Sequence, residues 1–201
     1  MTSRLLPFVG EVEGQVRSEQ LDAEAEARRL AALAQIRQYP DPALRIRANE
    51  VEDLDDAVSE LVARMTALMQ QARGVGLAAP QVGVLRRVLV YQVSEESPVV
   101  ALVNPRLARS SDEHETADEG CLSLGAASVV VPVARSTAVT IEAVTPDGEQ
   151  VTVEAEGLEA RVIQHELDHL DGVMILDRTG LDERRAALAQ LRPQPVLGPL
   201  V

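Results

Sequence analysis

Two histidines four residues apart are the clearest chemical signal in the sequence. They belong to the segment 165–169, His-Glu-Leu-Asp-His, which lies where apolar spacing predicts a helix. On a helix, four residues advance roughly 6 Å and turn about 400°, so both imidazoles lie on one face, one turn apart. That geometry lets both rings bind one metal ion, and Glu166 is placed to handle a proton of a metal-bound water. The pattern is typical of metal hydrolases.

A helix that carries these letters by chance is the alternative interpretation. Composition favours the metal, because two of the three histidines in the protein lie in this segment. They follow Ala160, Val162 and Ile163, which predict a helix buried along one side. Buried imidazoles need polar partners, and a metal ion supplies them. The third histidine, His114, lies among acidic residues and is expected in a solvated loop.

A catalytic metal also needs a third protein ligand and an open position. No His or Cys follows His169, so a downstream carboxylate is one candidate. These carboxylates are Asp171, Asp177, Asp182 and Glu183. The other candidate is Cys121, the only thiol, in the segment 119–123, Glu-Gly-Cys-Leu-Ser. A lone cysteine is more often a small buried apolar residue, so these residues alone leave the third ligand open.

A glycine-rich segment, GVGLAAPQ at residues 74–81, follows a predicted helix and precedes a predicted strand. This order is the reverse of a dinucleotide-binding fingerprint, and the chain has no Lys for a phosphate loop. Small residues permit close approach of the backbone to a ligand, and Gln81 supplies a neutral amide donor. An ordinary glycine-rich turn is the alternative.

The elements that must position these residues indicate an α+β fold. Helices are predicted over 21–36, 51–73, 157–170 and 182–191, the first with Ser18 as N-cap. Strands are predicted over 87–93, 99–103, 129–133, 139–144 and 150–154. The last two flank Asp147-Gly148, a strong hairpin signal. Because hairpin connections predominate and helices and strands do not alternate regularly, α+β is favoured over a doubly wound sheet.

Apolar stripes predict which helix faces are buried. The helix over 21–36 is expected to bury Leu21, Ala25, Leu30 and Leu33. The helix over 51–73 is expected to bury Leu54, Val58, Leu61, Met65 and Leu68. Residues 1–17 show no clear period and are expected to form an irregular arm.

Charge and cysteine usage narrow the classes of partner and compartment. The 201 residues carry a formal net charge of −13, and such an acidic surface repels phosphate backbones and anionic membranes. A single Cys, no secretory leader and no apolar stretch of membrane-spanning length favour a cytoplasmic protein. We therefore expect neither nucleic-acid nor membrane binding, and the sequence does not indicate an oligomeric state.

Three separated segments resemble the signature motifs of the peptide deformylase family, in that family's order. They are GVGLAAPQ (74–81), EGCLS (119–123) and QHELDH (164–169), and the segment 39–45 resembles the family's N-terminal stretch. The resemblance covers about residues 37 to 178. It suggests an N-terminal arm and helix over 1–36 and a catalytic domain over 37–180. A short helix and Pro-rich tail then follow over 181–201.

The resemblance implies a hydrolase that removes the formyl group from the N-terminal methionine of new proteins and releases formate. It implies that Cys121, His165 and His169 bind the metal and that Glu166 is the general acid/base. It implies Fe²⁺ as the native metal, with Zn²⁺, Ni²⁺ or Co²⁺ as substitutes. It also implies an α+β fold in which antiparallel sheets wrap a central helix carrying the HExxH motif.

Further residues are assigned to the substrate through the same resemblance. Gln81 and the backbone N–H of Leu122 are expected to bind the oxyanion, and Gly76 to close over the formyl group. The substrates implied are N-formylmethionyl peptides and nascent chains, bound as an added strand. The residues expected to line this site are Val75, Gly76, Gly120, Leu158 and Val162.

The chain also departs from the family pattern. Gly125 stands where a Pro is common, and the stretch before Arg135 is about two residues longer than usual. Arg135 is nevertheless the expected partner of Glu119. Two rival interpretations remain at this point: a zinc peptidase that uses the histidines but not Cys121, and a structural metal site or degenerate relative without catalysis.

Overall fold

The structure, a computed structural model, describes residues 12–13, 16–17, 23–125 and 129–191 of the 201-residue chain. Its helices are α1 (Ala23–Leu33), α2 (Asp56–Gln71), α3 (Gly157–Leu170) and α4 (Leu181–Leu191), with 3₁₀ turns η1 (Pro42–Arg45), η2 (Ala79–Val82) and η3 (Ile175–Asp177). Its strands are β1 (Val12–Glu13), β2 (Val16–Arg17), β3 (Gly76–Ala78), β4 (Val88–Tyr91), β5 (Val100–Ser110), β6 (His114–Gly120), β7 (Val130–Ser136), β8 (Ala138–Val144) and β9 (Gln150–Glu156).

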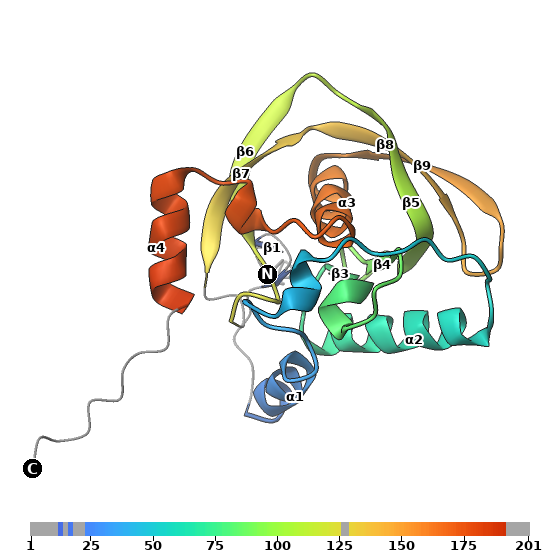
Figure 1. The fold of residues 1–201 in the computed structure, drawn as a ribbon, viewed down its shortest axis with the longest axis horizontal. Coiled ribbons are helices and arrows are strands. Elements are labelled where there is room, and N and C mark those ends of the chain that lie inside the picture. Colours follow the sequence, from blue (N-terminus) through green and yellow to red (C-terminus); the bar gives the residue numbers. More distant parts are fainter. Residues whose placement is uncertain (1–11, 14–15, 18–22, 126–128, 192–201) are drawn as a thin grey trace, which may run out of the picture.

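Antiparallel sheets surround α3, as expected from the sequence. Strands β3, β4, β5, β8 and β9 form one sheet in the order β3-β4-β5-β8-β9, and β6 pairs with β7 in a second sheet. Figure 1 shows β6 and β7 on one side of α3, with β5, β8 and β9 curving over it and β3 and β4 beneath. Helix α2 covers the other face of β3 and β4, and α4 packs outside β7. The predicted α+β class is confirmed.

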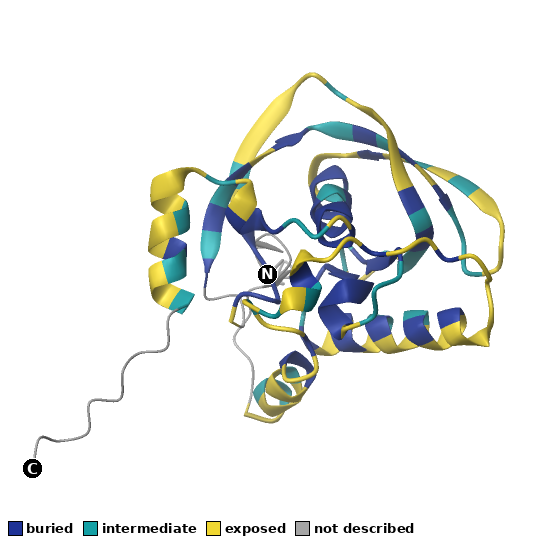
Figure 2. Ribbon diagram, in the orientation of Figure 1, coloured by how far each residue is buried: buried dark blue, intermediate teal, exposed yellow. Residues whose placement is uncertain are grey.

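Helix α3 has the bounds expected from its apolar spacing. Gly157 begins the helix with φ +55, and Gly172 follows its end with φ +73, a left-handed conformation that favours glycine. A Cβ on Gly172 would lie 2.7 Å from the Arg45 carbonyl oxygen, so η1 packs directly against this turn. The apolar side chains of α3, including Val162 and Ile163, pack in one cluster with β4, β5 and β8. Figure 2 shows the helix buried on nearly all sides.

Helix α2 begins later than predicted. Asp55 is its N-cap and accepts a hydrogen bond from the Val58 N–H at 3.1 Å, so residues 51–55 lie outside the helix. Val51 is instead anchored to β5, since its N–H donates to Asn104 Oδ1 at 2.8 Å. The predicted burial of Leu54 is wrong, because the residue is 41% exposed. The rest of the stripe is buried as predicted: Val58, Leu61, Met65 and Leu68.

Other differences concern short or polar segments. Strand β5 extends to Ser110, and β3 and β6 were not predicted. His114 begins β6 rather than lying in a loop, although it is exposed as expected. In α1, Leu33 is buried but Leu30 is 53% exposed, contrary to the prediction. Ser18 and Leu21 lie outside the described residues, and the arm contains the antiparallel pair β1–β2.

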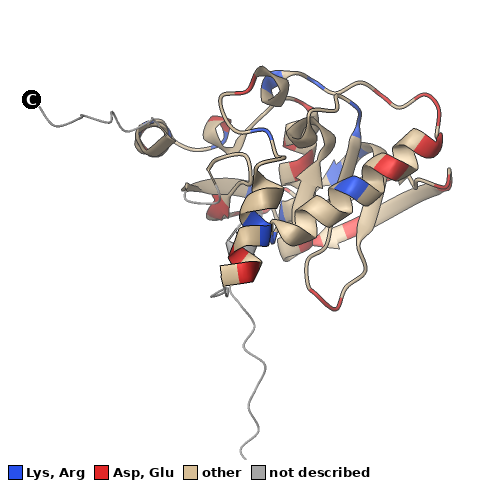
Figure 3. Cartoon of the chain, turned by 90° about the horizontal axis from the view of Figure 1, so that it is seen from below, with Lys and Arg blue, Asp and Glu red and all other residues tan. Residues whose placement is uncertain are grey.

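Opposite charges are interspersed on the face formed by α1 and α2 (Figure 3). In α1, Arg28 pairs with Glu24 at 2.8 Å and Arg29 with Glu26 at 3.4 Å. This face therefore does not present an extended patch of positive charge of the kind that attracts a phosphate backbone.

Candidate metal centre

The sulfur of Cys121 and the two imidazoles of α3 converge inside the protein. One donor atom from each of Cys121, His165 and His169 lies within 4.8 Å of the others. Cys121 Sγ and His169 Nε2 lie 3.3 Å apart, and the centroids of the two imidazole rings are 5.0 Å apart. All three residues are buried. The predicted convergence of the three residues is present. It arises because Cys121 directly follows the last residue of β6 and lies beside the buried face of α3.

The donor set fits a divalent metal ion. His165 Nδ1 lies 2.9 Å from Glu119 Oε2, while His165 Nε2 is buried without a hydrogen-bond partner among the described residues. His169 Nδ1 is likewise buried without such a partner in the described part of the chain. Two imidazoles and one thiolate are ligands that Zn²⁺, Fe²⁺ and similar cations accept. A cation bound by His165 Nε2 would satisfy a nitrogen that burial otherwise leaves without a protein partner among the described residues.

The downstream carboxylates lie in other interactions. Asp171 accepts from Arg87 at 2.7 Å, Asp177 pairs with Arg45, and Asp182 pairs with Arg185 at 3.3 Å. Glu183 is exposed beside Gly180. Among the described residues, the metal-ligand cluster at the motif helix contains Cys121 and none of these carboxylates. The geometry thus favours the thiol as third ligand.

Burial sets the ionisation of the ligands. Burial lowers the pKa of His169 well below its ordinary value, and the positive charges of Arg135 and of a protonated His165 act in the same direction. His169 is therefore neutral at physiological pH, which is the form that binds metals. Burial raises the pKa of the Cys121 thiol, although the Ser123 N–H opposes this shift. A cation beside the sulfur would stabilise the thiolate.

A buried ion-pair network lies behind His165. Arg135 donates to both oxygens of Glu119 at 2.9 Å, which confirms the pair expected from the sequence. Burial alone would raise the pKa of Glu119, but hydrogen bonds from Arg135 and His165 outweigh it and lower that pKa below the usual range. Arg161 also donates to Glu119, at 2.8 Å, a contact that the sequence analysis did not anticipate.

The carboxylate of Glu166 lies against the backbone of β3. Glu166 is fully buried, and a Cβ built on Gly76 would lie 2.2 Å from its Oε1. Only a residue without a side chain fits at position 76 while Glu166 keeps this place. The glycine-rich segment is therefore a close approach to the motif helix rather than an ordinary turn.

The amide of Gln81 is oriented by two contacts. Its Oε1 accepts from the Ala78 N–H at 2.9 Å, and its Nε2 donates to Ser123 Oγ at 3.1 Å. The same Nε2 lies 3.8 Å from Cys121 Sγ. The N–H₂ group therefore points toward the thiol, as the sequence analysis expected of a donor at this site.

Gln38 is a residue near the site that the sequence analysis missed. Its Nε2 donates to the Leu122 carbonyl at 3.0 Å, and its Oε1 accepts from the Gly125 N–H at 2.9 Å. It thus holds both ends of the turn that follows Cys121. In the sequence, Gln38 is marked only by its place two residues before Pro40, and that position does not indicate a contact with the turn after Cys121.

The residues expected to line the peptide site lie in different environments. Val75 and Val162 belong to one buried apolar cluster, and Gly120 is the buried last residue of β6. Leu158, in the first turn of α3, is 38% exposed. Their contact with a substrate stays a prediction.

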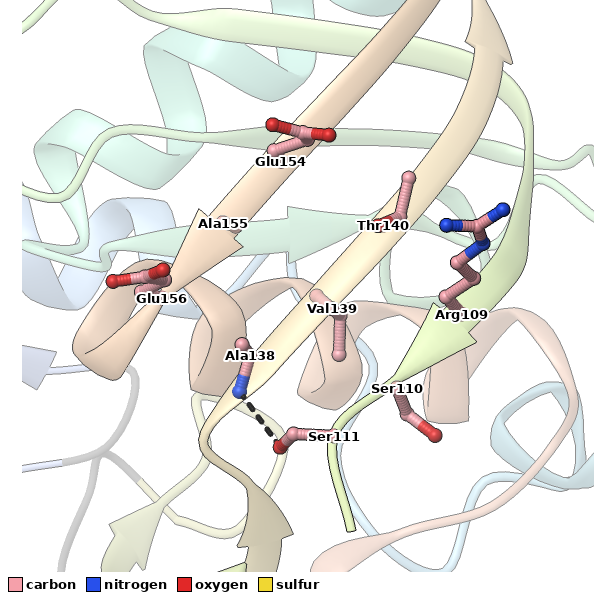
Figure 4. A pocket seen from close by; sticks show the side chains of 9 residues that line it. All are labelled: Arg109, Ser110, Ser111, Ala138, Val139, Thr140, Glu154, Ala155 and Glu156. Atoms are coloured by element: carbon pink, nitrogen blue, oxygen red, sulfur yellow. Dashed lines mark hydrogen bonds between the residues drawn. The ribbon is translucent and has the colours of Figure 1, made fainter. Parts of the chain in front are cut away.

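A shallow surface hollow of about 440 Å³ lies elsewhere, across the ends of β5, β8 and β9 (Figure 4). Its lining includes Arg109, Thr140 and Glu154, and none of the ligand residues. Ser111 Oγ is already used there, since it accepts from the Ala138 N–H at 3.2 Å. This hollow is therefore separate from the metal centre.

The sequence is similar to those of known proteins over most of its length. A family model described as polypeptide deformylase matches residues 33–185. A peptide deformylase of Natranaerobius thermophilus is 43% identical over 147 residues, which cover 73% of this chain and 92% of that protein. Peptide deformylase 1 of Corynebacterium glutamicum is 42% identical over 163 residues, or 80% of this chain and 95% of that protein.

Solved structures agree with the sequence matches. The crystal structure of a peptide deformylase from Synechococcus elongatus in complex with actinonin has a TM-score of 0.73 at 35% identity, covering 77% of this chain and 85% of that one. The peptide deformylase of Thermotoga maritima has a TM-score of 0.69 at 42% identity, covering 72% of this chain and 96% of that one.

Proposed function

This chain belongs to the polypeptide deformylase family, and we propose that its Cys121–His165–His169 centre binds the catalytic metal of that activity. The chain is a hydrolase that removes the formyl group from the N-terminus of newly made peptides. The observation that carries the site assignment is the buried convergence of one sulfur and two imidazoles within 4.8 Å. A zinc peptidase that ignores Cys121 is not favoured by this arrangement.

The metal supplies Lewis-acid charge and, when bound, lowers the pKa of a coordinated water from about 16 toward 7. The three ligands are compatible with several divalent ions, because affinity alone does not select among them. We propose Fe²⁺ as the native ion, with Ni²⁺, Co²⁺ and Zn²⁺ able to occupy the same ligands.

Glu166 is proposed to move the proton. Water adds to the formyl carbon as its proton passes to the Glu166 carboxylate, and the same group then gives a proton to the departing amine. The formyl C–N bond breaks, and the products are formate and a peptide with a free N-terminus. Burial between Gly76 and the motif helix supports this role, since it holds the carboxylate at one place beside the metal ligands.

Gln81 and the Leu122 N–H are proposed as donors to the oxyanion that develops on the formyl oxygen. Gln81 Nε2 already points toward Cys121, at 3.8 Å from the sulfur. Fixed donors of this kind are worth roughly 3 kcal/mol each in the transition state, because they need no reorganisation when charge develops. The Ala78 N–H and Ser123 Oγ hold the Gln81 amide in this orientation.

The substrates proposed are N-formylmethionyl peptides and nascent chains, bound as an added strand. Val75, Gly120, Leu158 and Val162 are the proposed lining residues, and Gly76 favours a small acyl group at the reacting end. No described helix has the length and apolarity to cross a membrane. We propose a cytoplasmic location, and a catalytic domain over 37–180 with residues 1–36 and 181–201 outside it.

Formate release from a formyl-Met peptide tests this assignment. Protein purified without oxygen and loaded with Fe²⁺ is expected to release formate, whereas Cys121→Ser is expected to lose both bound metal and turnover. Ser123→Cys in the Cys121→Ser background is a matched control, since it keeps one thiol in the same turn at a different place. Full turnover of Cys121→Ser with unchanged metal content would refute the ligand set.

A further inference from the structure

One face of α3 carries three buried polar residues. Arg161, His165 and Asp168 are separated by four and three residues, a spacing that places them on one side of a helix. Their exposed fractions are 9%, 2% and 7%, respectively. This stripe meets Glu119 and Arg135, which come from β6 and β7. Of the three, only His165 has a role in the centre described above.

The Glu119 carboxylate is shared by three side chains. Arg135 Nε and Nη2 donate to Oε1 and Oε2, each at 2.9 Å. Arg161 Nη1 donates to Oε1 at 2.8 Å, and His165 Nδ1 lies 2.9 Å from Oε2. Glu119 is fully buried, so water does not replace any of these donors.

Arg135 alone does not balance the buried negative charge. Its Nη1 donates to Asp168 Oδ2 at 2.6 Å, so one guanidinium serves two carboxylates. Each carboxylate has a second arginine: Arg161 for Glu119 and Arg178 for Asp168, the latter at 2.5 Å. If Glu119 lost Arg161, its carboxylate would depend on Arg135 alone and would shift toward it, because uncompensated buried charge is costly.

Arg161 also fixes the position of the carboxylate. Its Nη1 donates to the Val133 carbonyl at 3.0 Å in β7, and its Nη2 donates to the Glu115 carbonyl at 2.8 Å in β6. The planar guanidinium therefore ties α3 to both strands of the β6–β7 pair. Glu119 lies in β6 two residues before Cys121, so these bonds set its carboxylate relative to both metal-ligand elements.

We propose that Arg161 is a positioning residue for the metal centre that acts through Glu119 and fixes the ring orientation and tautomer of His165. A neutral imidazole has one donor and one acceptor nitrogen, and the hydrogen bond of one nitrogen decides the state of the other. An ionised Glu119 carboxylate only accepts, so Nδ1 of a neutral His165 must carry the proton toward it, which leaves Nε2 with the free lone pair. The inference rests on the proposed function, since it assumes that His165 binds a metal ion.

Nitrogen-15 NMR of the metal-free, folded protein tests the tautomer directly. In the wild type, His165 is expected to be the Nδ1–H tautomer. In Arg161→Met, which keeps an unbranched chain but removes the guanidinium, a mixture of tautomers is expected. Arg161→Lys, which restores the charge but not all the bonds, is expected to recover the wild-type tautomer in part.

Cobalt binding measures the consequence for the ligand set. Metal-free protein is titrated with Co²⁺, and binding is followed by the thiolate-to-cobalt absorption band, which reports Cys121 itself. Arg161→Met is expected to weaken Co²⁺ binding by 10- to 100-fold, the usual range for residues that orient a metal ligand. In a Glu119→Gln background the same substitution is expected to have little further effect, because its path to His165 is already lost.

Arg87→Met is the matched control. Arg87 is another buried arginine beside α3, and it donates to the Leu170 carbonyl and to Asp171 at the other end of the helix. Its loss is expected to cost stability but leave the His165 tautomer and Co²⁺ affinity unchanged. Should Arg161→Met not fold, Arg161→Gln, which removes the charge and keeps one donor group, replaces it under the same criteria.

The outcomes separate this inference from the proposed function. If the wild type shows no thiolate–cobalt band, the metal assignment fails, whatever Arg161 does. If the wild type binds Co²⁺ and Arg161→Met matches Arg87→Met in both tautomer and affinity, Arg161 has only a structural role. An undiminished effect in the Glu119→Gln background would overturn the path through Glu119.

Discussion

The α-carbon of Gly76 lies directly against the carboxylate of Glu166. A Cβ at position 76 would stand 2.2 Å from Glu166 Oε1 and 2.8 Å from its Cδ, both closer than non-bonded atoms approach. Glu166 is fully buried, so its carboxylate does not reach bulk solvent. The absence of a side chain in β3 thus determines where the proton-transfer group of α3 lies.

Gly76→Ala is expected to displace Glu166 and reduce kcat/KM by at least about 100-fold, because a misplacement of roughly 1 Å at a reacting group costs that much. Secondary structure and bound metal are expected to remain, since the three atoms nearest to such a Cβ belong to Glu166 and not to a metal ligand. Formate release and metal content measured on the same preparation check both parts.

Gly180→Ala controls for the general effect of adding a methyl group. A Cβ there would lie 2.4 Å from Glu183 Oε2, so this substitution also meets a glutamate carboxylate. Glu183 is exposed, however, and its side chain can rotate into solvent. Turnover close to that of the wild type is expected for Gly180→Ala, and equal losses for both variants would contradict the argument.

Glu166→Gln is expected to keep the fold and the metal but to lower kcat by about 10²- to 10⁴-fold, the range for removal of a general acid/base. Gln is nearly isosteric, so it fits beside Gly76, yet it does not carry the proton. The measurement is formate release per bound metal under saturating peptide. Near-normal turnover would remove Glu166 from the mechanism.

Asp177→Asn is expected to lower the free energy of unfolding by about 1 kcal/mol at neutral pH, as for a partly exposed charged hydrogen bond. Burial alone would raise the pKa of Asp177, but hydrogen bonds from the Met174 N–H and Arg45 outweigh it and lower the pKa below 3.8. A lowered folded-state pKa stabilises the protein above the unfolded pKa, and this stability is lost as the pH falls through the folded value.

Urea unfolding at several pH values checks this sign. The difference between wild type and Asp177→Asn is expected to be constant from pH 7 to about 5 and to shrink below the ordinary pKa of 3.8. Asp182→Asn is the control, because the Asp182 side chain is 90% exposed and its ion pair with Arg185, at 3.3 Å, lies on the surface of α4. It is expected to change stability by less than about 0.5 kcal/mol. If the stability difference between the wild type and Asp177→Asn grew as the pH fell, the lowered pKa of Asp177 would be contradicted.

Strong local patterns were predictable from the sequence. The bounds of α3 follow from its apolar spacing between Gly157 and the turn at Gly172, and the β8–β9 hairpin follows from Asp147-Gly148. These patterns depend only on residues that are close in sequence, so they can be read without knowing which elements pack against them in the fold. The three ligands were assigned through the family resemblance, and they converge in the structure.

Features that depend on tertiary partners were not predictable in the same way. Strand β6, His-Glu-Thr-Ala-Asp-Glu-Gly, has no β-branched apolar residue and is mostly exposed, and it is a strand because it pairs with β7 along its whole length. Helix α2 begins at Asp56 because Asp55 caps it, although an apolar stripe that included Leu54 suggested an earlier start. The Arg161–His165–Asp168 stripe did carry a signal, since polar residues at helical spacing in a buried helix need partners.

The last prediction concerns metal identity, and it follows from the ligand set. Two imidazoles and one thiolate accept several divalent ions, and thiolate donation makes a bound Zn²⁺ a weaker Lewis acid. Fe²⁺ beside a thiolate is open to oxygen, and Cys121 itself can oxidise. We expect high activity with Fe²⁺ prepared anaerobically, steep loss in air, stable activity with Ni²⁺ or Co²⁺, and markedly slower turnover with Zn²⁺. Formate release per bound metal, measured for each reconstituted form before and after exposure to air, checks this order. Equal activity of the Zn²⁺ and Fe²⁺ forms with no effect of air would exclude iron while leaving the hydrolase intact.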